Sequence, residues 1–193
     1  MHLHPADATP RAALVLGHGA GGGVDAPDLL AVTEAATASG ITVALVEQPY
    51  RVAGRRPPAP ARQLDENWVA IIAQLRAGPL ADLPVVTGGR SMGARVACRT
   101  AAQVGAIGVA CLAFPLVPPR RTGKPEPSSR LPELDALELP VVIIQGVRDP
   151  FGMPPARDGR SVIEVGGDHS LSSDVDAVTG ALLDWIEDLL AAA

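Results

Sequence analysis

The sequence predicts one α/β domain that spans residues 1–193 and is built on a doubly wound, mainly parallel sheet of about six strands. Apolar runs of strand length alternate with segments of helical length along the whole chain. The runs are apolar throughout, which indicates a sheet that helices cover on both faces. Hydrophobic residues make up 47% of the chain and charged residues 19%, a composition that can bury a core and excludes a disordered chain.

The predicted strands and helices alternate in regular order. Strands are expected at residues 12–16, 41–46, 84–87, 107–113, 141–145 and 161–165. Helices are expected at residues 27–39, 62–76, 92–104 and 174–190. Pro27 in the first turn and Gly40 just past the end are typical boundary residues of the first helix. The segment 115–139 is rich in proline and arginine, with room for a loop and one short helix near 132–137.

Charge and hydropathy argue against several classes of partner. Lys and Arg total 16 against 21 Asp and Glu, so the net charge is −5, whereas a protein that binds duplex DNA needs a basic face. No apolar run has the roughly 18 residues of a membrane-spanning helix, and the N-terminus lacks the pattern of a signal peptide. We therefore expect a cytoplasmic protein that binds neither nucleic acid nor membrane. Cys98 and Cys111 lie in apolar runs, where small buried side chains are expected.

The segment 89–93 reads Gly-Arg-Ser-Met-Gly and matches the pattern G-x-S-x-G. It lies between a predicted strand and a predicted helix, where a sharp turn strains the serine backbone and glycines allow close approach of neighbouring chains. This setting would place the Ser91 hydroxyl at the carboxyl end of the sheet as a nucleophile. The pattern alone is weak, and a glycine-rich turn without catalytic function is the alternative interpretation.

A serine nucleophile needs a base, and His169 is the best placed of the four histidines. It directly follows the last predicted strand, at the sheet edge where Ser91 is expected. His2 and His4 lie near the N-terminus, and His18 precedes the serine in the chain. We therefore expect His169 to take the proton of Ser91.

Asp149 is the expected partner that orients the histidine and stabilises its charged form. It follows the fifth predicted strand, again at the carboxyl edge. The order Ser91, Asp149, His169 is the one found in α/β-hydrolases. Asp168 adjoins the histidine, but chain neighbours rarely place a carboxylate against the inner ring nitrogen. An Asp-Pro turn without catalytic function is the alternative interpretation of Asp149.

An oxyanion needs hydrogen-bond donors, and two main-chain N–H groups are expected to supply them. One belongs to Met92, the residue after the nucleophile, and the other to Ala20 in the glycine-rich loop after the first strand. His18 and Gly19 of the same loop are candidate contacts of a substrate. Arg90 beside the nucleophile is a further candidate.

Arg90 and Arg148 flank the nucleophile and the acid in the sequence. Either guanidinium could bind an anionic group of a substrate. A structural ion pair, for instance with Glu47, is the interpretation that we favour slightly.

The glycine-rich run at 17–22 also fits G-x-G-x-x-G, the pattern of dinucleotide-binding loops, with Glu47 at the end of the next strand. Residues 23–27 separate the last glycine of this pattern from the predicted helix, so a pyrophosphate would miss the helix N-terminus. A nucleotide-binding oxidoreductase is therefore a weaker hypothesis.

Several stretches resemble the α/β-hydrolase superfamily, and within it the small dienelactone-hydrolase-like proteins, a group that includes testis-expressed and chromatin-associated relatives. The similar stretches are residues 18–21, 48–50, 55–57, 88–93, 113–116 and 145–152. The resemblance implies a minimal hydrolase fold without a full lid domain.

The sequence thus predicts a serine hydrolase that cleaves a small ester or related acyl substrate through an acyl-enzyme on Ser91. Neither a metal nor an organic cofactor is expected. The short segment 115–139 leaves little room for a deep acyl tunnel, so short acyl groups are expected to react best. The alternative is a non-catalytic interaction module with the α/β-hydrolase fold.

Overall fold

The computed structural model describes residues 1–120, 122–123 and 125–192. Its strands are β1 (His2–His4), β2 (Ala12–Gly17), β3 (Ile41–Val46), β4 (Val85–Arg90), β5 (Gly108–Leu112), β6 (Val141–Gly146) and β7 (Arg160–Val165). Its helices are α1 (Pro27–Ala38), α2 (Pro49–Val52), α3 (Ala61–Arg76), α4 (Met92–Thr100), α5 (Leu131–Asp135) and α6 (Val175–Ala191). Of the helices in the described part of the chain, none combines the length and apolarity that crossing a bilayer requires.

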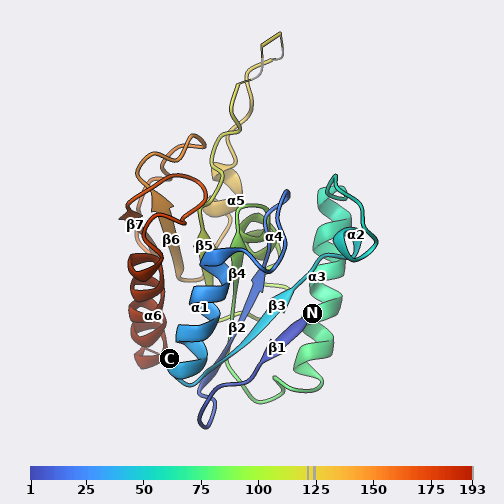
Figure 1. Ribbon diagram of the computed structural model, residues 1–193, viewed down its shortest axis with the longest axis vertical. Helices are drawn as coiled ribbons and strands as arrows, with labels where there is room; N and C mark the ends of the chain where they lie inside the picture. The colour runs from blue at the N-terminus through green and yellow to red at the C-terminus, as the bar shows by residue number, and fades with distance from the viewer. Residues whose placement is uncertain (121, 124, 193) are drawn as a thin grey trace.

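Within the described residues the strands form one seven-stranded sheet in the order β1-β3-β2-β4-β5-β6-β7 (Figure 1). All neighbouring pairs are parallel except β1 and β3, which are antiparallel. The doubly wound, mainly parallel sheet is thus confirmed. The strands β2 to β7 end at one edge of the sheet, and the long connection between β5 and α5 extends beyond that edge (Figure 1).

Two differences from the predicted elements concern strands. The edge strand β1 was not expected, because a three-residue strand in an exposed N-terminal segment carries no periodic signal. It forms by antiparallel pairing of His2, Leu3 and His4 with β3. The strand β4 continues to Arg90, three residues past its predicted end at Thr87, and therefore leads straight into Ser91.

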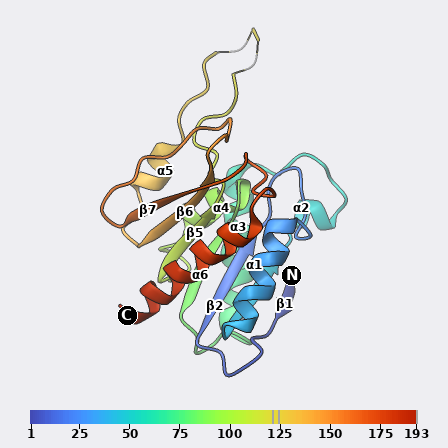
Figure 2. The same ribbon diagram turned by 60° about the vertical axis from the view of Figure 1, so that its left-hand side comes forward.

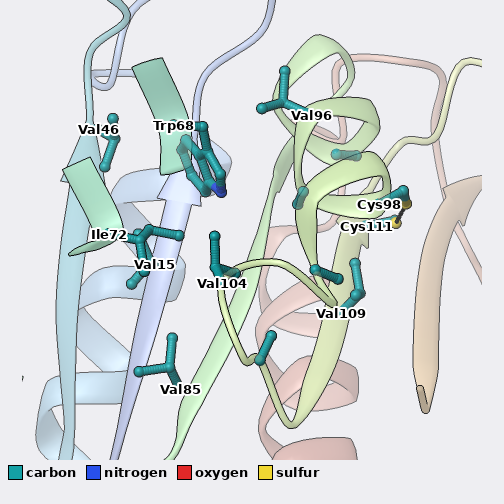
Figure 3. Packing of buried hydrophobic residues seen from close by; sticks show 14 of the residues in the cluster. Val15, Val46, Trp68, Ile72, Val85, Val96, Cys98, Val104, Val109 and Cys111 are labelled. Carbon is teal, nitrogen blue, oxygen red and sulfur yellow. Dashed lines mark hydrogen bonds between the residues drawn. The ribbon is translucent and has the colours of Figure 1, made fainter. Parts of the chain in front are cut away.

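The helices form two layers, one on each face of the sheet. The helices α1 and α6 lie side by side on one face (Figure 2) and pack on Leu14, Leu16 and their neighbours. The helices α3 and α4 cover the other face, where Trp68 of α3 is fully buried near Val15 (Figure 3). With apolar layers on both sides, the sheet holds its strand ends in fixed positions.

The two cysteines are buried in the layer under α4, as the apolar runs predict. The sulfur atoms of Cys98 and Cys111 lie 3.6 Å apart (Figure 3). The hydrogen bond with Cys98 and burial raise the pKa of the Cys111 thiol well above its ordinary value, so it stays protonated and packs as a small apolar group.

The turn between β4 and α4 packs main chain against main chain on the end of β2. A Cβ atom on Gly89 would lie 2.4 Å from the Gly17 carbonyl oxygen, and one on Gly93 would lie 2.3 Å from the same atom. Gly89 also has a φ of +151°, which a side chain would strain. Both glycines of the G-x-S-x-G pattern are therefore required by close approach of a neighbouring strand.

We expect Gly93→Ala to lower the free energy of unfolding by roughly 1–3 kcal/mol, because the added methyl group overlaps the backbone of β2. Gly180→Ala is the matched control, since a Cβ there meets nothing within 4 Å. This exposed helix position should gain about 0.5–1 kcal/mol from the same change. Urea unfolding of the two variants measures both effects. Equal stabilities would contradict the packing argument.

Candidate active site

Ser91 occupies a strained turn between β4 and α4. Its φ is +53° and its ψ is −102°, a region that residues with a side chain rarely adopt. Its N–H donates a hydrogen bond to the carbonyl oxygen of Leu112, 2.9 Å away on β5. Such a turn aims the hydroxyl away from the sheet edge, as the nucleophile of a strand–turn–helix motif requires.

Ser91, His169 and Asp149 form a continuous chain of contacts. The Nε2 atom of His169 lies 2.8 Å from the Ser91 hydroxyl, and its Nδ1 atom lies 2.7 Å from Oδ2 of Asp149. A carboxylate only accepts hydrogen bonds, so Nδ1 carries the hydrogen and Nε2 is left to accept from the serine. The Asp149 side chain is fully buried, whereas the His169 side chain is 19% exposed.

Asp149 is held by two further donors. The N–H of Phe151 donates to Oδ1 over 2.8 Å, and the side-chain amide of Gln145 donates to Oδ2 over 2.8 Å. The same amide nitrogen lies 3.1 Å from the Phe114 carbonyl oxygen and 2.9 Å from that of Gly152. Gln145 therefore joins three segments around the acid. Its only signal in the sequence is an amide at the end of an apolar strand.

The ring of Phe151 packs against the ring of His169, with centroids 4.3 Å apart and an interplanar angle of 36°. This contact and the bond to Asp149 restrict the histidine from two sides. The sequence analysis did not single out Phe151, because a lone aromatic residue after an Asp-Pro pair carries no specific signal.

The glycine-rich loop lies beside the nucleophile. A Cβ atom on Gly19 would lie 3.7 Å from the Ser91 Cβ, and Ala20 lines the same cavity as Ser91 and Met92. The hydroxyl of Tyr50 donates to the Ala20 carbonyl oxygen over 3.1 Å and holds the loop. Because Met92 starts α4, its N–H has no preceding helical carbonyl to bond.

His18 lies inside the protein, although the sequence suggested it as a substrate contact. Its side chain is fully buried, its Nδ1 atom lies 2.7 Å from the Gly19 carbonyl oxygen, and its Nε2 atom accepts from the Gln48 N–H over 3.1 Å. Burial lowers the pKa of the imidazole, which favours its neutral form. Both ring nitrogens thus have protein partners, so His18 holds the loop in place and has no nitrogen left for a substrate.

Arg90 forms the structural ion pair that the sequence analysis favoured, but with a different partner. Its Nε lies 3.1 Å from Oδ2 of the buried Asp28 at the start of α1, while Glu47 lies 3.3 Å from His2 instead. Another guanidinium nitrogen of Arg90 donates to the His169 carbonyl oxygen over 3.0 Å. Burial raises the pKa of Asp28, and the nearby guanidinium opposes that shift. Arg90 thereby ties the histidine loop to α1.

A cavity of about 690 Å³ opens next to Ser91. Its wall is formed by residues near the start of α3, by Ser91 and α4, by the segment after β5, and by one residue each from the loops after β2 and β6. The lining residues are Ala20, Pro58, Ala59, Ala61, Leu64, Ser91, Met92, Arg95, Arg99, Pro115, Pro118, Pro119, Arg120, Arg130 and Phe151. The proline-rich segment 115–139, which was expected to leave little room for a deep acyl tunnel, forms one side of a cavity of ligand size.

Among the described residues, no group of three or more His, Cys, Asp or Glu side chains is arranged to bind a metal ion. The loop at 17–22 does not lead into a helix, because α1 begins only at Pro27. The helix N-terminus that a dinucleotide would use thus lies away from the glycines.

We expect Gln145→Leu to lower the free energy of unfolding by roughly 1–3 kcal/mol, because it leaves buried acceptors without a donor. Activity should fall as well, since Asp149 loses one of its restraints. Gln103→Leu, at an exposed position, is the control and should leave stability within about 0.5 kcal/mol of native. Thermal or urea unfolding checks the difference. A native-like Gln145→Leu protein would contradict the role given to this amide.

Three solved structures show the same fold. A serine hydrolase without a lid from Xanthomonas campestris is 16% identical, with 96% of this chain and 87% of that chain covered and a TM-score of 0.75. Est1E from Butyrivibrio proteoclasticus is 13% identical, with 98% and 93% covered and a TM-score of 0.71. The esterase domain of a Rhodothermus marinus protein is 16% identical, with 95% and 90% covered and a TM-score of 0.68.

A comparison with curated proteins gave no significant match. The family model described as an alpha/beta hydrolase domain matches residues 10–177, which include the nucleophile turn, Asp149 and His169. The match covers most of the sequence and agrees with the observed sheet. The chain therefore belongs to the α/β-hydrolase domain family.

Proposed function

We propose that the protein is a serine hydrolase that cleaves a small ester or related acyl substrate through an acyl-enzyme on Ser91. The observation that carries this proposal is the unbroken contact from the Ser91 hydroxyl through His169 to the buried Asp149, at 2.8 and 2.7 Å. These distances fit proton transfer from serine to histidine without rearrangement.

In the first half of the reaction, the Ser91 oxygen attacks the substrate carbonyl while His169 Nε2 accepts its proton. Asp149 compensates the positive charge that develops on the imidazole. The carbonyl oxygen becomes an oxyanion, and the N–H groups of Met92 and Ala20 are the donors that we assign to it. His169 then gives its proton to the leaving group as the tetrahedral intermediate collapses to the acyl-enzyme.

In the second half, water attacks the acyl-enzyme and His169 takes its proton. The same donors hold the second oxyanion, and the proton returns to Ser91 as the acid product leaves. In this scheme His169 carries each proton and main-chain donors hold each oxyanion. We therefore propose that the reaction needs no partner other than a small-molecule acyl substrate and water.

The alternative function, a non-catalytic interaction module, accounts for less of the structure. Surface recognition requires neither the positive φ of Ser91 nor a buried carboxylate behind a histidine. Strain of this kind persists where the surrounding structure holds it for function. The catalytic proposal is therefore the better supported of the two.

We expect a fluorophosphonate probe to label the protein at Ser91, because the adjacent histidine activates the hydroxyl. Labelling should be absent from Ser91→Ala, while circular dichroism and unfolding of that variant stay native-like. Mass spectrometry of the labelled peptide identifies the site. No labelling of the native protein, or labelling only at another serine, would favour the interaction module.

We expect His169→Ala to lower kcat by on the order of 10⁴–10⁶, and Asp149→Asn somewhat less, because the three residues act as a unit. His2→Ala is the matched control, since this exposed histidine on β1 lies apart from the cavity. Steady-state hydrolysis of p-nitrophenyl acetate measures the effect. A His169→Ala enzyme with near-native kcat would show that another group is the base.

A further inference from the structure

The cavity beside Ser91 has an unusual distribution of charge. Its charged lining residues are Arg95, Arg99, Arg120 and Arg130, and no acidic side chain of the described residues lines it. The chain as a whole has a net charge of −5, so this concentration of cations is local. A concave wall with charge of one sign raises the local concentration of the opposite ion.

Two of these arginines form ion pairs with carboxylates that do not line the cavity. Arg99 pairs with Asp65 of α3 through two contacts of 2.8 and 2.6 Å. Arg95 pairs with Glu133 of α5 through contacts of 2.9 and 2.5 Å. Glu133 also lies 3.4 Å from Arg99. Two acids thus compensate two cations and hold their guanidinium groups in place.

The positive charge that these two carboxylates do not compensate comes from Arg130 and Arg120. Arg130 donates to the Pro115 carbonyl oxygen over 2.9 Å, and in the described part of the chain no ion pair involves it. One bond occupies one of its five N–H donors. Burial lowers the pKa of Arg130, and the charges of Arg95 and Arg99 lower it further, while the nearby Glu133 carboxylate opposes that shift. Arg120 is exposed at the rim of the same cavity.

The position of the cavity indicates which part of a substrate it holds. Its lining includes Ala20 and Met92, the assigned oxyanion donors, and Phe151, whose ring packs against His169, while His169 itself is not part of the lining. On this basis we place the acyl part of an ester in the cavity and the leaving group beside His169, which protonates it.

The geometry of α4 brings cations within reach of an acyl chain. Ser91, Arg95 and Arg99 follow one another at intervals of four residues, which places them on one face of the helix about 6 Å apart along its axis. Arg95 and Ser91 both line the cavity, one helical turn apart. The apolar walls at Leu64 and Phe151 can cover the methylenes between a scissile carbonyl and a terminal anion.

We propose that the substrate of this hydrolase carries a carboxylate on its acyl part, and that Arg130, together with Arg95, binds this carboxylate while Ser91 attacks the ester. The inference rests on the proposed function and adds the substrate class. A guanidinium fork fits a carboxylate through two parallel hydrogen bonds. A bound carboxylate would reduce the repulsion among the arginines. It would also give their N–H groups new hydrogen bonds in place of the water that it displaces, which a neutral acyl chain would not do.

The test compares two p-nitrophenyl esters that differ at the far end of the acyl chain: mono-p-nitrophenyl adipate, which ends in a carboxylate, and its methyl ester, in which a methyl group removes the charge. The native enzyme should show a kcat/KM roughly 10-fold higher for the anionic ester, the effect of one charged hydrogen bond. Most of the difference should lie in KM. Raising the salt concentration should reduce it, because Arg130 is only partly buried.

Arg130→Gln should reduce the ratio of the two kcat/KM values, anionic ester over methyl ester, from roughly 10 to about 1, and Arg130→Lys should restore part of this ratio. Arg62→Gln is the matched control, because it removes the same charge from a side chain that is 90% exposed outside this cavity. Arg120→Gln, at an exposed position, tests the same cavity without disturbing packing and should give a smaller loss in the same direction.

Equal kcat/KM values for the two esters in the native enzyme would overturn the inference and leave the hydrolase proposal standing. So would an equal loss on both esters in Arg130→Gln. Calorimetric titration of Ser91→Ala with monomethyl adipate separates the two proposals, because it needs no catalysis. If Ser91→Ala binds monomethyl adipate and the double variant Ser91→Ala with Arg130→Gln does not, the anion site is supported. This holds even where neither ester is hydrolysed, although that outcome contradicts the hydrolase proposal. Absence of binding and of hydrolysis would overturn both.

Discussion

The close contact between the end of β2 and the nucleophile turn is the constraint on which the site depends. Gly89 and Gly93 both lie against the Gly17 main chain, closer than any side chain would permit. Gly17 is followed directly by the loop that contains Ala20. This backbone contact therefore fixes both the strained turn of Ser91 and its distance from Ala20, the residue that we propose as the second oxyanion donor.

A second contact of the same kind places the acid and the base. A Cβ atom on Gly146, at the end of β6, would lie 2.4 Å from the Asp168 carbonyl oxygen. The Arg148 N–H donates to the Gly167 carbonyl oxygen over 2.9 Å, which joins the loop of Asp149 to the loop of His169. Because parallel strands end at one edge, two such glycine contacts are enough to assemble side chains that are 78 residues apart in the sequence.

Sequence reasoning predicted the parts of the molecule that depend on local pattern. The strand–turn–helix around Ser91 and the order of Asp149 and His169 follow from apolar runs and the residues that end them, and the fold class is confirmed. Contacts between distant segments carry no such pattern. The pairing of Arg90 with Asp28 and the bonds of Gln145 depend on how helices and loops close over the sheet. The cavity was missed for the same reason, since five separate segments form its wall.

In the proposed reaction, negative charge develops on the substrate near the arginines, and positive charge develops on His169. Different groups of the protein compensate these two charges. In this proposed reaction, attack on the carbonyl creates an oxyanion at the N-terminus of α4, where main-chain N–H groups and the helix dipole favour negative charge. The imidazolium that forms at the same time faces the fully buried Asp149, which lies outside the lining of the arginine cavity. The positive wall can therefore attract an anionic acyl chain and favour the oxyanion, while a dedicated carboxylate compensates the charged histidine.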